Sequence, residues 1–247
     1  MPLLGLHMTV ARQIAADLKS PIVDADRGAY YLGATTPDIR AMTRWDRERT
    51  HFFRLDDFGD QSGVHRLLAE HSELANASAL DSPTASFIAG YISHLVLDEE
   101  YITQIYRQCF GTGGALSERA RPDVKDRLLQ LDLERQERED TRAVTEIRQA
   151  LTETSAEFAV DFLARDTLLE WRNWQVEHVV NAPRFEKMIV RHLAAAGIEG
   201  EEAVAVFLGQ AESELRETME GVGEERIRDF LSSAKDKARL RMKEYLS

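Results

Sequence analysis

The sequence predicts an all-α protein. Apolar residues recur mainly at helical spacing, and the alternation of apolar and polar residues that is typical of strands is nearly absent. Only 6 prolines and 14 glycines interrupt the 247 residues, so long helices can form between the breaks. The hydrophobic fraction of 43% and the charged fraction of 30% are typical of a folded globular chain rather than a disordered one.

Three helices are expected before the most apolar segment. The first covers 10–18, where apolar residues recur at every fourth position, and Thr9 is its expected N-cap. A second, short helix covers 26–32, and a third covers 60–77. The segment 33–51 contains a proline and alternating charges, which favour a loop-rich structure.

The fourth expected helix, 82–110, contains the most apolar stretch of the chain. Ser82 and Pro83 form a typical helix start, and the glycine-rich run 111–114 is a clear end. Apolar residues cover almost every face of the segment 87–97. A helix that is apolar on all sides is a buried one.

The composition changes after the glycine-rich run. Residues 117–192 are rich in Glu, Arg, Gln and Leu, which favours long amphipathic helices. Two further helices are expected at about 200–220 and 223–245, with a break of two glycines and a valine between them. These helices should be longer and more solvated than those of the amino-terminal half.

Charge and composition exclude several classes of protein. Lys and Arg number 31 and Asp and Glu 43, a formal net charge of −12, so we expect no nucleic-acid partner. No run approaches the roughly 18 apolar residues of a membrane span, so no integral membrane segment is expected. The first residues lack the basic region of a signal peptide, and Cys109 is the single cysteine, so we expect a cytoplasmic protein.

His94 and Asp98 lie four residues apart within the buried fourth helix, and therefore on one face of it. An ionised carboxylate without a partner is costly to bury, and a metal ion held by both side chains would compensate that cost. A hydrogen bond between the two side chains inside the core is the simpler alternative, and the pattern leaves both open. Gly90, one turn earlier, would let another backbone or a ligand approach closely.

Other residues of the amino-terminal half complete a candidate metal site. His51 lies between a charged segment and two phenylalanines, His7 follows a glycine and a leucine, and Asp38 follows Pro37. Each of these is more typical of a structural residue when it is taken alone. Together they give three imidazoles and two carboxylates: His7, Asp38, His51, His94 and Asp98. That donor set suits zinc, and also iron or manganese, and a carboxylate could bridge two ions.

The order of these residues resembles that of the zinc-dependent phospholipase C family. The resemblance is carried by segments 5–7, 32–38, 50–52 and 90–98, and it covers roughly residues 1–110. The family includes bacterial phospholipases C and the amino-terminal domain of glycosylphosphatidylinositol-specific phospholipase D. Its fold is similar to that of the S1/P1 nucleases. The resemblance implies a multi-helix bundle of this type, with metal ions in a cleft.

The resemblance also implies how the metal ligands are shared. It makes four residues the ligands of one ion: Asp38, His51, His94 and Asp98. His7 would bind a neighbouring ion, with Asp98 bridging the two. Better-studied members hold a third metal through further histidines and a His–Glu pair, but alanines lie four residues after His178 and His192 here. We therefore expect one or two zinc ions.

Arginines at positions 44, 47, 49 and 54 surround His51 in the sequence. Guanidinium groups bind phosphate well, so this group is a candidate for substrate binding. Acidic residues are interleaved with these arginines, however, and such mixed charge is more typical of a solvated loop.

The combined features predict a metal-dependent hydrolase that cleaves a phosphoester, with a phosphodiester or a lipid headgroup as the favoured substrate. Asp38 would orient or deprotonate a metal-activated water, and Asp98 would bridge, so these two are the expected catalytic residues. The alternative is a non-catalytic protein in which a closed metal site clamps helices and the acidic helices bind a partner. We expect a single helical domain, 1–247, in which 1–114 binds metal and 115–247 pack on it as a lid or a cleft wall.

Overall fold

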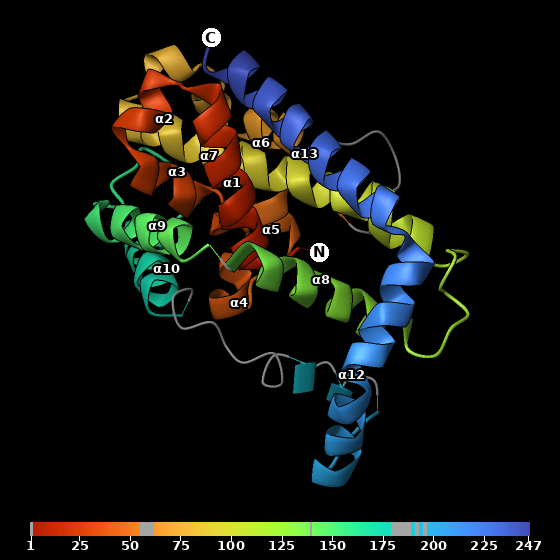
Figure 1. Cartoon of the computed structure of the whole chain (residues 1–247). Coiled ribbons are helices and arrows are strands. Elements are labelled where there is room, and N and C mark those ends of the chain that lie inside the picture. The colour runs from red at the N-terminus through yellow and green to blue at the C-terminus, as the bar shows by residue number, and fades with distance from the viewer. Residues whose placement is uncertain (1, 55–61, 139, 179–188, 191–192, 195–196) are drawn as a thin grey trace.

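The computed structural model of this chain is built from helices joined by loops, and no strand occurs in the part that it describes (Figure 1). The structure describes residues 2–54, 62–138, 140–178, 189–190, 193–194 and 197–247. The all-α prediction is confirmed. Within the described ranges, no helix combines the length and the apolar character that crossing a bilayer requires.

The amino-terminal half begins with α1 (Leu4–Leu18), α2 (Pro21–Ala25) and α3 (Arg27–Gly33). One-turn helices follow as η1 (Thr36–Ile39), α4 (Arg40–Thr43) and α5 (Glu48–His51). The next elements are α6 (Gly63–Glu70), η2 (Ser72–Leu74), η3 (Ala77–Ala79), α7 (Ser82–Glu100) and the π-helix η4 (Tyr101–Phe110). The later helices are α8 (Pro122–Arg138), α9 (Thr141–Glu153), α10 (Arg165–His178), α12 (Glu201–Val222) and α13 (Glu224–Tyr245).

Helix α1 begins six residues earlier than predicted. It starts at Leu4, so Thr9 lies inside the helix, and the expected N-cap at this residue is wrong. The N-cap is Leu3, which has extended backbone angles and no side-chain hydrogen bond. The additional residues at the start of α1 pack against α8. A Cβ atom at Gly5 would lie only 2.6 Å from the side chain of Glu134, so the absent side chain makes room for this contact.

Two further segments differ from the prediction. The segment 33–51 contains three one-turn helices rather than mainly loops. The predicted helix 60–77 is too long, because α6 ends at Glu70 and two turns of 3-10 helix follow it. At His71 the backbone leaves the helical region, and its ring nitrogen Nδ1 lies 2.9 Å from a carboxylate oxygen of Asp161. Residues 60 and 61 lie outside the described residues.

Helices α3 and α7 cross so closely that each places a glycine against the backbone of the other. A Cβ atom at Gly90 of α7 would lie 2.0 Å from the carbonyl oxygen of Tyr30. A Cβ atom at Gly33 of α3 would lie 1.9 Å from the carbonyl oxygen of Phe87. The prediction that Gly90 allows a close backbone approach is therefore confirmed. This crossing fixes where α7 presents its polar residues.

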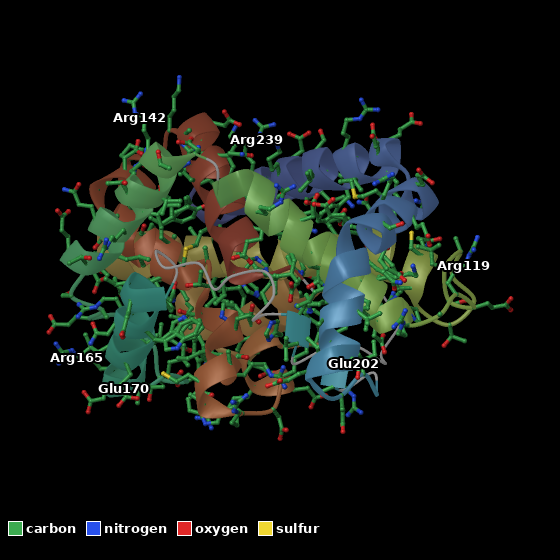
Figure 2. The ribbon with its side chains drawn as sticks, turned by 60° about the horizontal axis from the view of Figure 1, so that its bottom comes forward. Arg119, Arg142, Arg165, Glu170, Glu202 and Arg239 are labelled. Atoms are coloured by element: carbon green, nitrogen blue, oxygen red, sulfur yellow. The ribbon has the colours of Figure 1, made fainter. Side chains whose placement is uncertain are left out.

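The carboxy-terminal helices contribute to the same core. Figure 1 shows α13 lying along α7, and α13 buries Phe230, Ala234 and Met242 there. Helix α9 packs on α3, and α8 packs on α1. A smaller apolar cluster joins α8 to α12 through residues such as Leu128 and Phe207. The charged side chains labelled in Figure 2 lie at the periphery of the molecule, as expected for solvated helix faces.

Buried tyrosines make the stability of the protein sensitive to alkali. Burial raises the pKa of Tyr31 to about 12 and raises the pKa values of Tyr30, Tyr91 and Tyr101 above their ordinary value of 10. The unfolded chain loses these protons near pH 10, whereas the folded chain keeps them. We therefore expect stability to be retained below pH 10 and to fall above it, by about 1.4 kcal/mol per pH unit for each tyrosine.

Urea unfolding at pH 9 and at pH 11 measures this effect, with absorbance at 295 nm reporting the ionised tyrosines. We expect a lower midpoint at pH 11 and tyrosinate absorbance that, apart from the partly exposed Tyr106, rises only as the chain unfolds. Equal midpoints, or more tyrosinate in the folded state than the partly exposed Tyr106 accounts for, would contradict the burial of these phenols.

Candidate metal centre

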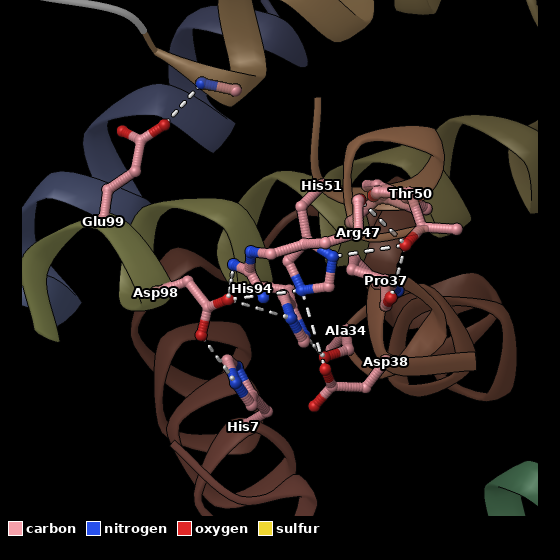
Figure 3. A network of polar contacts seen from close by, with 12 residues as sticks. His7, Ala34, Pro37, Asp38, Arg47, Thr50, His51, His94, Asp98 and Glu99 are labelled. Atoms are coloured by element: carbon pink, nitrogen blue, oxygen red, sulfur yellow. Dashed lines mark hydrogen bonds and ion pairs between the residues drawn. The ribbon is translucent and has the colours of Figure 1, made fainter. Parts of the chain in front are cut away.

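All the residues predicted as metal ligands lie together where α1, η1, α5 and α7 meet (Figure 3). Each element contributes one ligand, except α7, which contributes two. The residues are His7 from α1, Asp38 from η1, His51 from α5, and His94 and Asp98 from α7.

Asp98 is at the centre of the group, and its two oxygens face different partners. Oδ2 lies 3.3 Å from Nε2 of His51 and 3.7 Å from Nε2 of His94. Oδ1 lies 3.4 Å from Nε2 of His7. Nε2 of His51 also lies 3.5 Å from Oδ1 of Asp38. The structure thus brings together residues that are up to 91 positions apart in the sequence.

Neighbouring backbone and hydroxyl groups orient two of the imidazoles. Nδ1 of His94 lies 2.8 Å from the carbonyl oxygen of Ala34, so it carries the proton and donates. Nδ1 of His51 lies 3.2 Å from the hydroxyl of Thr50, and that hydroxyl donates to the carbonyl of Pro37 at 2.8 Å. The hydroxyl therefore accepts from His51. In both rings the lone pair of Nε2 is left free to bind a metal.

Several buried polar atoms of the site make no hydrogen bond within the described part of the chain. They are Nε2 of His7, His51 and His94, and Oδ1 of Asp98. A buried polar atom without a partner costs about 1–3 kcal/mol, so four such atoms in one place require an explanation. Nitrogen and carboxylate donors are ligands of zinc, and the donor set therefore fits a divalent ion.

The ligand atoms form two overlapping groups in which all atoms lie within 4.8 Å of one another. One group consists of His7, His94 and Asp98, and the other of Asp38, His51 and His94. His94 belongs to both, and a single imidazole nitrogen binds only one ion. The geometry therefore offers one ion position around His94, with His7 and Oδ1 of Asp98 left to face a neighbouring position.

The carboxylates of the site are ionised at neutral pH. Burial by itself raises the pKa of Asp98, but the guanidinium of Arg47 holds that pKa well below its ordinary value. Burial likewise opposes ionisation of Asp38, but its interaction with His51, whose Nε2 lies 3.5 Å from Oδ1, holds the pKa of Asp38 low. Both side chains are therefore available as anionic ligands.

His94 is neutral under the same conditions. Burial, together with the His7 ring stacked on it with 3.7 Å between ring centroids, lowers the pKa of His94 to about 3. A metal binds the neutral form of an imidazole, so this ring needs no deprotonation before it can act as a ligand.

Arg47 is a residue of the site that the sequence pattern misassigned. The pattern favoured a solvated loop, but the side chain of Arg47 is only 10% exposed, and its Nη2 donates to Oδ2 of Asp98 at 2.7 Å. Arg44, Arg49 and Arg54 are exposed, as expected of such a loop. Position 47 lies one helical turn before His51, and this spacing is the signal that distinguishes it.

Comparison with known proteins gives one match. Residues 6–98 match the model of a family described as zinc dependent phospholipase C. The matched segment contains all five candidate ligands and ends at Asp98. No curated protein and no solved structure matches the chain. The side chain of His178 and all of His192 lie outside what the structure describes.

Proposed function

Because residues 6–98 match the model of the zinc-dependent phospholipase C family, we propose that this protein is a metal-dependent hydrolase of phosphoesters, with phosphodiesters as its substrates. The observation that carries the proposal is the group of buried nitrogen and oxygen atoms around Asp98 that make no hydrogen bond. A purely structural core would pair these atoms with one another or with backbone groups. Their convergence on one point is instead typical of a cation site.

We assign the ligands of the first ion as Asp38, His51, His94 and Oδ2 of Asp98. His7 and Oδ1 of Asp98 would hold a second ion, so that Asp98 bridges. Zinc suits these donors best, and iron or manganese would also accept them. When bound, such an ion lowers the pKa of a coordinated water and neutralises charge on the phosphoryl oxygens of a substrate.

Exposure distinguishes the roles of the two carboxylates. The Asp98 side chain is fully buried, whereas the side chain of Asp38 is 18% exposed. Water and substrate must therefore approach from the side of Asp38, which we assign to orienting the attacking water and accepting its proton. The side chain of Asp98 is fully buried, so we assign it to balancing the charge of the ions and positioning the histidines.

Metal removal tests the proposal. We expect the zinc-loaded protein to hydrolyse bis(p-nitrophenyl) phosphate, a chelator to abolish this activity, and added zinc to restore it. The monoester p-nitrophenyl phosphate serves as the matched control and should be hydrolysed more slowly. A protein that unfolds on chelation and hydrolyses no member of a phosphoester panel would instead have a structural metal that clamps the four elements.

A further inference from the structure

We infer that Arg47 is a substrate-binding residue, whose guanidinium donates hydrogen bonds to a phosphoryl oxygen of a phosphodiester held beside Asp98. The inference rests on the proposed function and adds to it a group that recognises the anion. Arg47 is not among the five predicted ligands, and as a permanent cation it cannot bind a metal.

The one-turn helix α5 directs Arg47 into the site. The backbone N–H of His51 donates to the carbonyl oxygen of Arg47 at 2.8 Å, which places the two residues one turn apart. Residues with this spacing lie on the same face of a helix. Figure 3 shows both side chains pointing toward Asp98.

The guanidinium is buried with most of its donors unused. Nη2 donates to Asp98, whereas Nε and Nη1 are buried and make no hydrogen bond within the described residues. The ring of Phe53 lies 4.7 Å from Cζ and covers one face of the group. An arginine that served only to neutralise Asp98 would be expected to use its remaining donors on nearby carbonyls. The free donors therefore point to a ligand that carries oxygen atoms.

The charges of the site favour an anion. The first ion of the proposed site would balance the carboxylates of Asp38 and Asp98. The guanidinium of Arg47, and the second ion where it is bound, then leave positive charge in a buried place, where an unpaired charge is costly. The negative charge of a phosphodiester would compensate it.

Exposure separates Arg47 from the neighbouring arginines. Arg49 lies two positions away, is exposed, and stacks on the ring of Trp45 at 3.6 Å. It offers a matched control, because Arg49→Met removes the same charge from the same segment without touching the buried group.

Calorimetric titration tests the inference in two steps, first with zinc and then with dimethyl phosphate added to the zinc-loaded protein. For Arg47→Met we expect zinc affinity that is unchanged or higher, because a nearby positive charge is removed. We expect its dimethyl phosphate affinity to fall by about 10-fold or more, as for the loss of a charged hydrogen bond. Arg47→Lys should recover part of this loss, and Arg49→Met should bind as the wild type does.

Two results would overturn the inference. One is that dimethyl phosphate binds Arg47→Met as tightly as it binds Arg49→Met. The other is that the zinc affinity of Arg47→Met falls together with its dimethyl phosphate affinity, which would indicate that Arg47 only supports the metal ligands. If Arg47→Met does not fold, Arg47→Lys, which keeps the positive charge, can be compared with the wild type and with Arg49→Met instead. A wild-type protein that binds no zinc contradicts the proposed function itself, and one that binds zinc but no dimethyl phosphate contradicts only the role of Arg47.

Discussion

Asp98→Asn should abolish tight zinc binding and lower phosphodiester hydrolysis by more than about 100-fold, beyond the 10–100-fold that is typical of groups that merely support ligands. The substitution keeps the shape of the side chain and removes its charge. Three histidines lie 3.3–3.7 Å from the two oxygens of Asp98, so a neutral amide would remove the anionic centre of the site. Elemental analysis of the dialysed protein measures the metal, and initial rates measure the activity.

The same substitution should destabilise the metal-free fold. Asp98 accepts a hydrogen bond from the buried guanidinium of Arg47, and loss of one partner of a buried ion pair costs about 3–5 kcal/mol. The double variant Asp98→Asn with Arg47→Met should therefore recover stability without recovering zinc. This comparison separates loss of the metal from loss of the fold.

Asp126→Asn is the matched control for this experiment. Asp126 is also a buried carboxylate, which accepts hydrogen bonds from Tyr101 at 2.6 Å and Gln130 at 2.7 Å, neither of which is a proposed ligand. Its amide variant should lose stability but retain zinc. If Asp98→Asn kept a full zinc content, or if both variants lost zinc equally, Asp98 would not be a ligand.

The strongest sequence signal was a polar pair in an apolar helix. His94 and Asp98 stand out because the residues around them are apolar on every face, and a buried helix carries such groups only where something compensates them. The overall helical class followed from the spacing of apolar residues in the same way. Both features depend on residues close together in the chain, and such local patterns can be predicted from a single sequence.

The features that the sequence did not predict depend on contacts between distant segments. Helix α1 extends to Leu4 because Gly5 packs on Glu134 of α8, more than 120 positions away. Arg47 is buried because α5 turns it toward Asp98, although its sequence neighbours indicate a solvated loop. Tertiary packing determines where this helix begins and whether this arginine is buried, and neither helix propensity nor charge pattern predicts that packing.

The last expected result concerns the crossing of α3 and α7, where Gly90→Ala should destabilise the protein by about 3 kcal/mol or more. In an exposed helix the same change stabilises by about 0.5–1 kcal/mol, so the sign of the effect is diagnostic. At Gly90 the added methyl group would lie 2.0 Å from the carbonyl oxygen of Tyr30 and 2.8 Å from the backbone nitrogen of Ala34. Both atoms are backbone, so the helices must separate.

Gly209→Ala provides the matched control, because Gly209 lies on an exposed face of α12 with no heavy atom within 4 Å of the new methyl group. Thermal unfolding should show a lower midpoint for Gly90→Ala and an equal or higher one for Gly209→Ala. The crossing also sets the position of Ala34, whose carbonyl oxygen orients His94. Folded Gly90→Ala should therefore bind zinc about 10–100-fold more weakly. Unchanged stability and zinc affinity in this variant would mean that the two helices do not fix the imidazole, and the link from backbone packing to the metal centre would fail.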